Sequence, residues 1–230
     1  MPPSAPDTIV IVAAYNEADR LAATLAAVGE AFPDARVLVA DDASRDATGH
    51  VALQHGAELV RAPRTIGKGG ANTLAAEKVM AAALTPPEPV IVLCDGDLGE
   101  TARELPALAA AVREGGADLA IASFARRVGG GFGFAVSFSR WATRRLGGVE
   151  LEAPISGQRA LRGSALPVLV PFAARFGMET AMNVDAARAG LRIEQVELDL
   201  AHRATGRTLR GFLHRARQLT DFVLVYLNRR

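Results

Sequence analysis

Two aspartates, Asp95 and Asp97, stand directly after the apolar run 90–94. That run opens with three β-branched residues, and its unbroken apolar character predicts a strand covered on both faces of a sheet. Open α/β sheets bind ligands at the carboxyl ends of their strands, so we expect both carboxylates at a binding edge. Gly96, between them, lets the backbone turn sharply and approach a ligand closely. Hard carboxylate oxygens suit Mg²⁺ or Mn²⁺ that carries a diphosphate, although two aspartates in a solvated loop would give the same pattern.

Two other predicted strands, 8–14 and 36–40, also end in polar residues. The first leads into the turn 15–17, and the second leads into Asp41 and Asp42. In a parallel sheet these residues would share one edge with the two aspartates of the central strand. Asp42 could accept a hydrogen bond from a ring N–H of a nucleotide base. Capping of the next helix is the alternative, and we favour that role for Asp41 or Asp46.

A single lysine, Lys68, lies between two glycines in the segment 65–70. Small neighbours leave the backbone free to contact phosphate oxygens, and the lysine would supply positive charge. The segment is not a Walker A motif, which needs four residues between its glycines and Ser or Thr after the lysine, and it does not match the dinucleotide-binding glycine pattern. A solvated loop lysine is an equally good interpretation of this segment.

One histidine, His202, follows a strand-like segment, 196–200, and precedes Arg203 and Arg207. A neutral imidazole binds divalent metal ions, and arginine suits phosphate groups. A lone histidine is more often structural or exposed, but the neighbouring arginines favour a ligand-binding role.

The elements that must position these residues alternate between strand and helix in the first half of the chain. Predicted strands occupy 8–14, 36–40, 58–61, 90–94 and 118–123, and predicted helices occupy 19–31, a segment ending near 54, 71–84 and 101–114. This alternation predicts a doubly wound α/β domain with a mainly parallel sheet flanked by helices. After residue 123 we expect a glycine-rich loop over 126–134, helices at 135–146 and 178–189, a turn into a short strand over 154–162, a strand at 192–198 and a last helix from 209.

The composition is that of a globular protein and argues against nucleic-acid binding. The chain has 230 residues, half of them apolar, and a formal net charge of +1. No global field therefore attracts nucleic acid, and no apolar run approaches the roughly 20 residues that span a bilayer. The start lacks a basic region and a long apolar run, so we expect no signal peptide and a cytoplasmic protein. The single cysteine, Cys94, is expected to be a buried apolar residue.

Read together, these segments resemble nucleotide-sugar-dependent glycosyltransferases of the GT-A type, family 2 in particular. Residues 14–17 look like the family's opening Pro/Ala-x-Asn-Glu turn, and residues 39–46 are similar to its Val-Asp-Asp-Gly-Ser-x-Asp segment, with Ala43 in place of the glycine. Asp95-Gly96-Asp97 stands at the Asp-x-Asp position of the family.

The later half is more specifically similar to glucosyl-3-phosphoglycerate synthases. The matching segments are 67–69, 176–180 and 202–207, and they occur in the same order. The chain is shorter than typical members, and the stretch 126–145 does not match closely, which leaves the acceptor open. The resemblance implies a single GT-A domain over 1–230, with a nucleotide-binding half (1–123), an acceptor and metal half (124–208) and a C-terminal amphipathic helix (209–230).

The resemblance also implies roles for the matching residues. Asp42 would hold the base, Lys68 the nucleotide phosphates and Asp95 the ribose or the metal. Mg²⁺ or Mn²⁺ would be bound by Asp97 and His202, together with Asp95. The other implied contacts to the donor or its sugar are Ala14, Tyr15, Glu17, Gly96, Gly157, Gln158, Arg203 and Arg207.

The implied reaction moves a hexosyl group from a nucleoside diphosphate sugar, UDP-glucose or a GDP-sugar, to a small anionic acceptor such as a phosphoglycerate. The metal, held by Asp97, would stabilise the leaving diphosphate. Glu179 stands where the family keeps an acid near the acceptor. It would be the general base of an inverting reaction or would orient substrate in a retaining one, and the sequence leaves both open.

Two other interpretations concern the enzyme class and the C-terminus. A sugar nucleotidyltransferase would need a Gly-rich Arg-Met signature after its first strand, which is missing. In the region 209–230, apolar residues fall on one helical face and basic ones largely on the other. Such a helix could cover the domain's own core, contact a partner in a homodimer, or bind a membrane surface, in which case the acceptor would be a polyprenyl phosphate.

Overall fold

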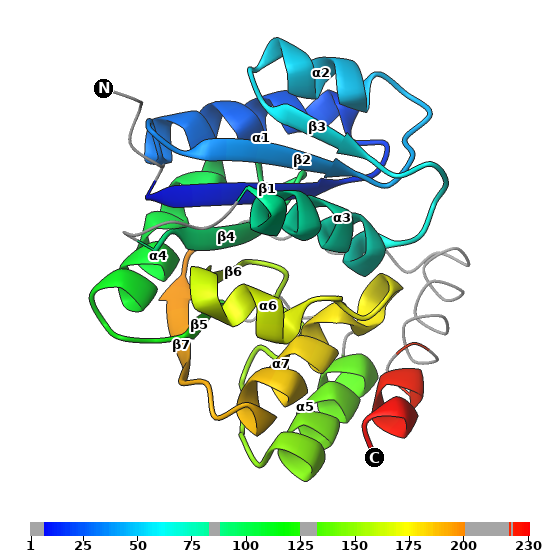
Figure 1. Cartoon of the computed structure of the whole chain (residues 1–230), viewed down its shortest axis with the longest axis vertical. Coiled ribbons are helices and arrows are strands. Elements are labelled where there is room, and N and C mark those ends of the chain that lie inside the picture. The colour runs from blue at the N-terminus through cyan, green and yellow to red at the C-terminus, as the bar shows by residue number, and fades with distance from the viewer. Residues whose placement is uncertain (1–6, 83–87, 125–132, 201–220, 222) are drawn as a thin grey trace.

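The computed structural model describes residues 7–82, 88–124, 133–200, 221 and 223–230. They form a seven-stranded sheet with helices on both faces (Figure 1). The sheet order is β3-β2-β1-β4-β6-β5-β7. The strands are β1 (Thr8–Ala14), β2 (Arg36–Asp41), β3 (Glu58–Arg61), β4 (Val90–Asp95), β5 (Leu119–Phe124), β6 (Arg159–Arg162) and β7 (Ile193–Leu198). The predicted mainly parallel α/β sheet is confirmed.

One strand, β6, runs antiparallel to both of its neighbours, whereas the other neighbouring pairs are parallel. Its first residue, Arg159, pairs with Leu93 near the carboxyl end of β4. The turn that precedes β6 therefore lies at the same edge as Asp95. The sequence pattern indicated a short strand here but not its direction.

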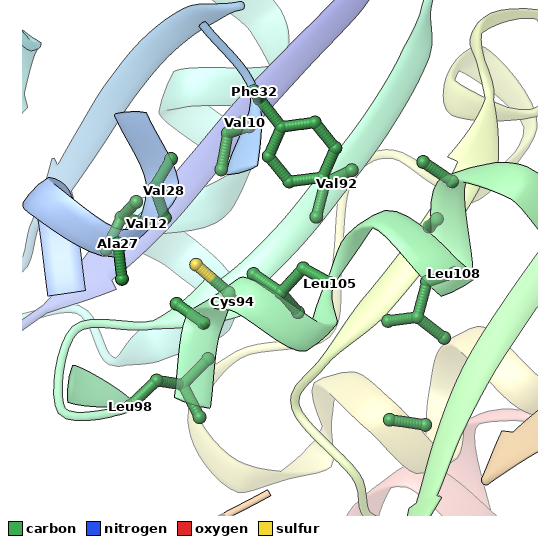
Figure 2. Close-up of a cluster of buried hydrophobic side chains, with 14 of the residues drawn as sticks. Val10, Val12, Ala27, Val28, Phe32, Val92, Cys94, Leu98, Leu105 and Leu108 are labelled. Atoms are coloured by element: carbon green, nitrogen blue, oxygen red, sulfur yellow. The ribbon is translucent and has the colours of Figure 1, made fainter. Parts of the chain in front are cut away.

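Alternation along β1 divides the apolar residues between two cores. Val10 and Val12 belong to the core beneath α1 and α4, which Figure 2 shows. Ile9 and Ile11 belong to the core on the opposite face. Because both faces are covered, the strand is apolar from Ile9 to Ala14, as expected for a central parallel strand. Cys94 is buried in the first core, as predicted.

The helices form a layer on each face of this sheet. One layer contains α1 (Ala18–Ala31), α2 (Thr48–Gln54) and α4 (Pro106–Arg113). The other contains α3 (Lys68–Ala81), α6 (Leu166–Leu169) and α7 (Met178–Arg188), and α5 (Gly133–Gly147) packs on α7. Short 3₁₀ turns lie at Gly99–Glu104, Gly163–Ala165 and Arg175–Gly177. Among the described residues, no helix is both long and apolar enough to cross a bilayer.

The helices differ most from the predicted ones in three places. The helix expected from residue 71 begins at Lys68, so the lysine belongs to the first turn of α3 rather than to a loop. The helix expected over 101–114 is split, because Pro106 lacks an N–H donor and begins a new helix. The short helix α6 was not anticipated. Most of the predicted loop 126–134, and residues 209–220 of the predicted final helix, lie outside the described part of the chain.

Candidate active site

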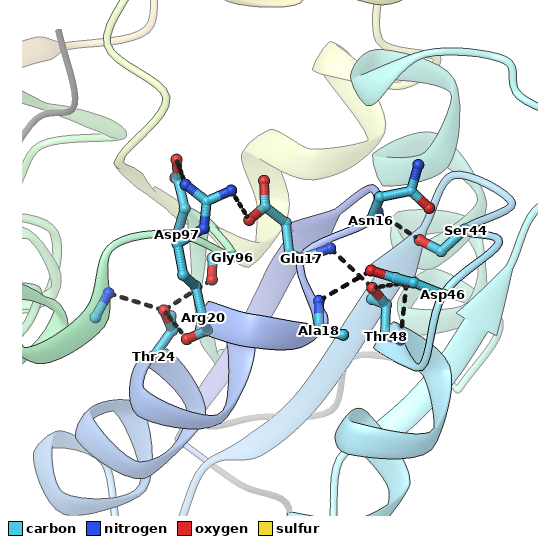
Figure 3. A network of polar contacts seen from close by, with 11 residues as sticks. Asn16, Glu17, Ala18, Arg20, Thr24, Ser44, Asp46, Thr48, Gly96 and Asp97 are labelled. Atoms are coloured by element: carbon cyan, nitrogen blue, oxygen red, sulfur yellow. Dashed lines mark hydrogen bonds and ion pairs between the residues drawn. The ribbon is translucent and has the colours of Figure 1, made fainter. Parts of the chain in front are cut away.

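The turn after β1 is tied by hydrogen bonds to the turn after β2, as Figure 3 shows. The backbone N–H of Asn16 donates to Ser44 Oγ (2.9 Å), and that of Glu17 donates to Thr48 Oγ1 (2.8 Å). Asn16 has a φ of 54°, in the left-handed region that asparagine tolerates better than most residues. Next to it the ring of Tyr15 is about half exposed. The two turns form one rim at the carboxyl edge of the sheet, as the strand pattern predicted.

Asp42 is buried and receives hydrogen bonds from another segment of the chain. Its carboxylate accepts from the backbone N–H of Ile66 (2.6 Å) and from that of Gly67 (2.9 Å). These contacts fix the turn immediately before Lys68, so the position of the lysine depends on this carboxylate. A contact of Asp42 with a nucleotide base stays a prediction.

The centre of the site is a cluster of charges at the carboxyl end of β4. Lys68 Nζ lies 2.6 Å from Asp95 Oδ1 and 2.8 Å from Glu179 Oε1. Gln158 Nε2 donates to the other oxygen of Asp95 at 2.9 Å. Each of these four residues was predicted separately as a site residue. The structure brings them together from four places in the chain: α3, β4, α7 and the turn before β6. A cation is thus held between a carboxylate of the nucleotide-binding half and a carboxylate of the later half.

Electrostatics keep the lysine of this cluster charged. Burial alone would lower the pKa of Lys68, but the adjacent carboxylates of Asp95 and Glu179 outweigh it and raise this pKa above its usual range. Lys68 is therefore a permanent cation at physiological pH. A fixed positive charge of this kind can compensate negative charge that appears on a neighbouring group during a reaction.

The glycines on either side of Lys68 serve close packing. A Cβ on Gly69 would overlap the backbone carbonyl of Ala173, and a Cβ on Gly67 would collide with the backbone of Arg175. Gly67 also has a φ of 86°, which side chains rarely adopt. The two glycines thus let α3 begin against the segment 173–175, just before the helix that carries Glu179. The sequence pattern was compatible with a phosphate-binding loop or a solvated loop and did not indicate this packing role.

Gly157 lies against the charge cluster. A Cβ at this position would overlap both Asp95 Oδ2 and Lys68 Nζ, so only glycine leaves the ion pair its present geometry.

Replacement of Gly157 by alanine is expected to lower kcat/KM by about 100-fold, because displacement of catalytic groups by roughly 1 Å can have that effect. The thermal unfolding midpoint should change little, since the displaced atoms are side-chain ends. Steady-state kinetics and thermal unfolding measure the two effects. Gly29→Ala is the matched control, because Gly29 has open space around it in α1. Equal kinetics for both variants would show that this close approach has no role in the reaction.

Arg159 was not predicted from the sequence, yet it organises the turn that carries Gly157 and Gln158. Its side chain is fully buried and donates to the carbonyls of Ser156 (2.9 Å) and Pro154 (3.2 Å) and to Asn183 Oδ1 (2.7 Å). Burial lowers the pKa of Arg159 to about 10, partly offset by Glu179, so the guanidinium stays charged at neutral pH. An arginine at the start of a short predicted strand is the signal that could have identified it.

Arg159→Met is expected to destabilise the fold by about 2–3 kcal/mol, because buried acceptors lose their donor. Arg162→Met on the same strand should change stability by less than about 1 kcal/mol, since Arg162 is partly exposed and pairs with Asp118 near the surface. Chemical denaturation of the two variants measures the difference. Similar losses would mean that the buried hydrogen bonds of Arg159 contribute no more than a surface pair.

Asp97 differs from Asp95 in how far neighbouring groups compensate its negative charge. Its side chain is 39% exposed, and Arg20 lies 3.9 Å away while making a closer ion pair of 2.6 Å with Glu17 (Figure 3). Asp95, by contrast, has a partner on each oxygen. Within the described residues, the charge of Asp97 is therefore less compensated than that of Asp95.

The donor set at this edge fits a hard divalent cation in part. Asp95 and Asp97 supply carboxylate oxygens, which Mg²⁺ and Mn²⁺ prefer. Within the described residues, no three His, Cys, Asp or Glu side chains are clustered as a complete metal site. The third predicted ligand, His202, lies outside the described residues, as do Arg203 and Arg207.

Comparison with known proteins identifies the family to which the chain belongs. A family model described as glycosyl transferase family 2 matches residues 9–160. The chain belongs to this family. An undecaprenyl-phosphate mannosyltransferase of Micrococcus luteus is 32% identical over 214 residues, covering 86% of this chain and 85% of that protein. An uncharacterised glycosyltransferase of Mycobacterium tuberculosis is also 32% identical, covering 86% of this chain and 87% of the other.

Solved structures of glucosyl-3-phosphoglycerate synthase from Mycobacterium tuberculosis have the same fold. The complex with Mn²⁺ and UDP-glucose is 27% identical with a TM-score of 0.74, and it covers 97% of this chain and 79% of that one. The complex with phosphoglyceric acid is 25% identical with a TM-score of 0.75, covering 98% and 80%.

Membership of glycosyl transferase family 2 confirms the predicted fold and enzyme class: the protein is a nucleotide-sugar-dependent glycosyltransferase with a GT-A fold. The matched region includes Lys68, both aspartates of the Asp-x-Asp segment and the turn before β6. Glu179 and His202 lie beyond it. The roles of individual residues stay predictions.

Proposed function

We propose that this glycosyltransferase moves a hexosyl group, with glucose from UDP-glucose as the leading candidate, to an acceptor that carries a phosphate group. The arrangement of Lys68 between Asp95 and Glu179 is the observation that carries this proposal. Lys68 provides a cation where the diphosphate of the donor would lie. Glu179 provides an acid on the side of Lys68 that faces away from Asp95. Support for the donor comes from the synthase structures, one of which is a complex with Mn²⁺ and UDP-glucose.

The reaction breaks the bond between the anomeric carbon and the β-phosphate oxygen of the donor, and the electron pair leaves with UDP. A new bond forms between the anomeric carbon and an acceptor oxygen. Lys68 would stabilise the negative charge that grows on the leaving diphosphate. Gln158 and Gly157 would hold Asp95 and Lys68 in place while this happens. Glu179 would face the acceptor and either receive the proton of an acceptor hydroxyl or orient the acceptor.

A divalent cation, Mn²⁺ or Mg²⁺, would be held by Asp97 and Asp95, with His202 as the remaining predicted ligand. When bound, it supplies additional positive charge to the diphosphate.

The acceptor has two candidates that share a phosphate group. A small phosphorylated acid such as a phosphoglycerate is favoured by the synthase structures, one of which contains phosphoglyceric acid. A polyprenyl phosphate is favoured by the relative from Micrococcus luteus, whose name specifies undecaprenyl phosphate. In the first case a hydroxyl would attack and must lose a proton. In the second a phosphate oxygen, already deprotonated at neutral pH, would attack.

The test combines each donor with each acceptor. UDP-glucose, UDP-galactose and GDP-mannose are incubated with Mn²⁺ and either 3-phosphoglycerate or detergent-dispersed undecaprenyl phosphate, and the products are identified by mass spectrometry. We expect a hexosylated product with UDP-glucose and one of the phosphate-bearing acceptors, and none after chelation of the metal. Turnover of a nucleotide sugar without transfer to either acceptor would refute the acceptor class. No binding or turnover of any nucleotide sugar would refute the donor assignment.

A further inference from the structure

An exposed aromatic cluster joins α5 to the C-terminal helical segment 223–228. Both elements lie at the end of the molecule opposite to β3 (Figure 1). The rings of Trp141 and Tyr226 have centroids 4.9 Å apart, and Phe138 lies 5.5 Å from Trp141. Trp141 is nevertheless 49% exposed. Large aromatic side chains normally bury most of their surface, so an exposed tryptophan in an aromatic cluster needs an explanation.

Aliphatic side chains extend this cluster along the C-terminal segment. Val223 and Leu227 are exposed and lie three residues before and one residue after Tyr226. At helical spacing, these three residues share one side of the segment. We define the aromatic patch as Phe138, Trp141, Val223, Tyr226 and Leu227.

The charged side chains of α5 and of residues 223–230 are all basic. Arg144 and Arg145 are exposed on the last turn of α5, three and four residues after Trp141, and Arg230 is exposed at the end of the C-terminal segment. Neither α5 nor the segment 223–230 contains an acidic residue. Arg229 pairs with Asp185 of α7 at 2.6 Å, so the nearby acid of α7 is already neutralised. The patch is thus apolar and aromatic with a basic border.

We propose that the aromatic patch docks the protein onto the surface of a bilayer that contains anionic phospholipids. Trp and Tyr favour the boundary between acyl chains and headgroups, and basic residues beside them attract anionic headgroups. A second copy of the chain fits less well, because a two-fold contact through this patch would place arginines against their own copies.

The aromatic patch is also connected to the candidate active site through the packing of α5 on α7. α5 packs on α7, and the buried hydroxyls of Ser139 and Thr180 are hydrogen-bonded at 2.6 Å. Thr180 directly follows Glu179, the carboxylate that contacts Lys68. Docking through α5 would therefore hold the acceptor side of the site near the membrane surface. The inference goes beyond the proposed function, since membrane docking does not depend on the identity of donor or acceptor.

Flotation of the full-length protein with vesicles tests this inference without any substrate. Vesicles of phosphatidylcholine alone are compared with vesicles that contain about 30% phosphatidylglycerol. We expect flotation with the anionic vesicles that weakens as salt rises, because screening reduces the arginine contribution. Trp141→Glu combined with Leu227→Glu, and separately Arg144→Glu combined with Arg145→Glu, should each reduce bound protein at least tenfold.

Two matched controls carry the same kind of change elsewhere. Leu53 on α2 and Val168 on α6 are exposed apolar residues outside the aromatic patch, so Leu53→Glu and Val168→Glu should float like the unmodified protein. Thermal unfolding verifies that each variant is folded. Equal flotation of patch and control variants, or no flotation with anionic vesicles, would overturn the inference. So would a concentration-dependent dimer that only the patch variants abolish, because a second copy would then occupy the surface. None of these outcomes depends on which sugar is transferred.

Discussion

Replacement of Lys68 by methionine is expected to lower kcat/KM by roughly 100- to 1,000-fold, the range for loss of one preorganised electrostatic group. The reason is the position of its ammonium group between Asp95 and Glu179, at 2.6 Å and 2.8 Å. Without it, two carboxylates would face an incoming diphosphate and repel it. Donor turnover at saturating metal measures the effect on the reaction, and UDP binding by calorimetry measures the effect on the diphosphate.

Lys78→Met is the control for this experiment. Lys78 lies on the same helix, but it is half exposed and pairs with Glu58 at the surface. Its loss should leave turnover within about twofold and stability nearly unchanged, because exposed ion pairs contribute little. If Lys68→Met and Lys78→Met had the same kinetics, the charge cluster at β4 could not be the catalytic centre.

Replacement of Asp97 by asparagine is expected to lower activity by about 1,000-fold, because a neutral amide is a poor ligand for a divalent cation. The fold should be unaffected, since Asp97 is 39% exposed and its described ion-pair contact with Arg20 is a distant 3.9 Å. A severe kinetic loss without a stability loss would therefore report directly on function. The dependence of activity on Mn²⁺ concentration and the thermal unfolding midpoint provide the two measurements.

Asp34→Asn serves as the comparison for Asp97→Asn. Asp34 is exposed just before β2, at the amino edge of the sheet, opposite to the candidate site. We expect an unchanged Mn²⁺ dependence for this variant. Full activity of Asp97→Asn at ordinary metal concentrations would remove Asp97 from the metal site.

The fold was predictable in its first half because each strand carries its own local signal. The runs that became β1 and β4 are apolar except for Thr8 at the start of β1 and Asp95 at the end of β4, and a strand between two helical layers needs that composition. Strand direction beyond β5 was not predictable, because the four residues of β6 have the same pattern in either direction. The sequence pattern predicted a loop at Lys68 because flanking glycines usually interrupt helices. Here the glycines instead permit close contact of the first turn of α3 with residues 173–175.

The sequence by itself determined the α/β class, the glycosyltransferase family and the residue types that gather at the carboxyl edge of the sheet. These follow from local composition and from short motifs in a specific order. Only the tertiary structure decided that Lys68 joins Asp95 to Glu179, that Gly157 must stay small and that Arg159 supports the turn beside them. Such contacts join positions up to 111 residues apart, and no local pattern encodes which side chains a fold will bring within 3 Å of one another.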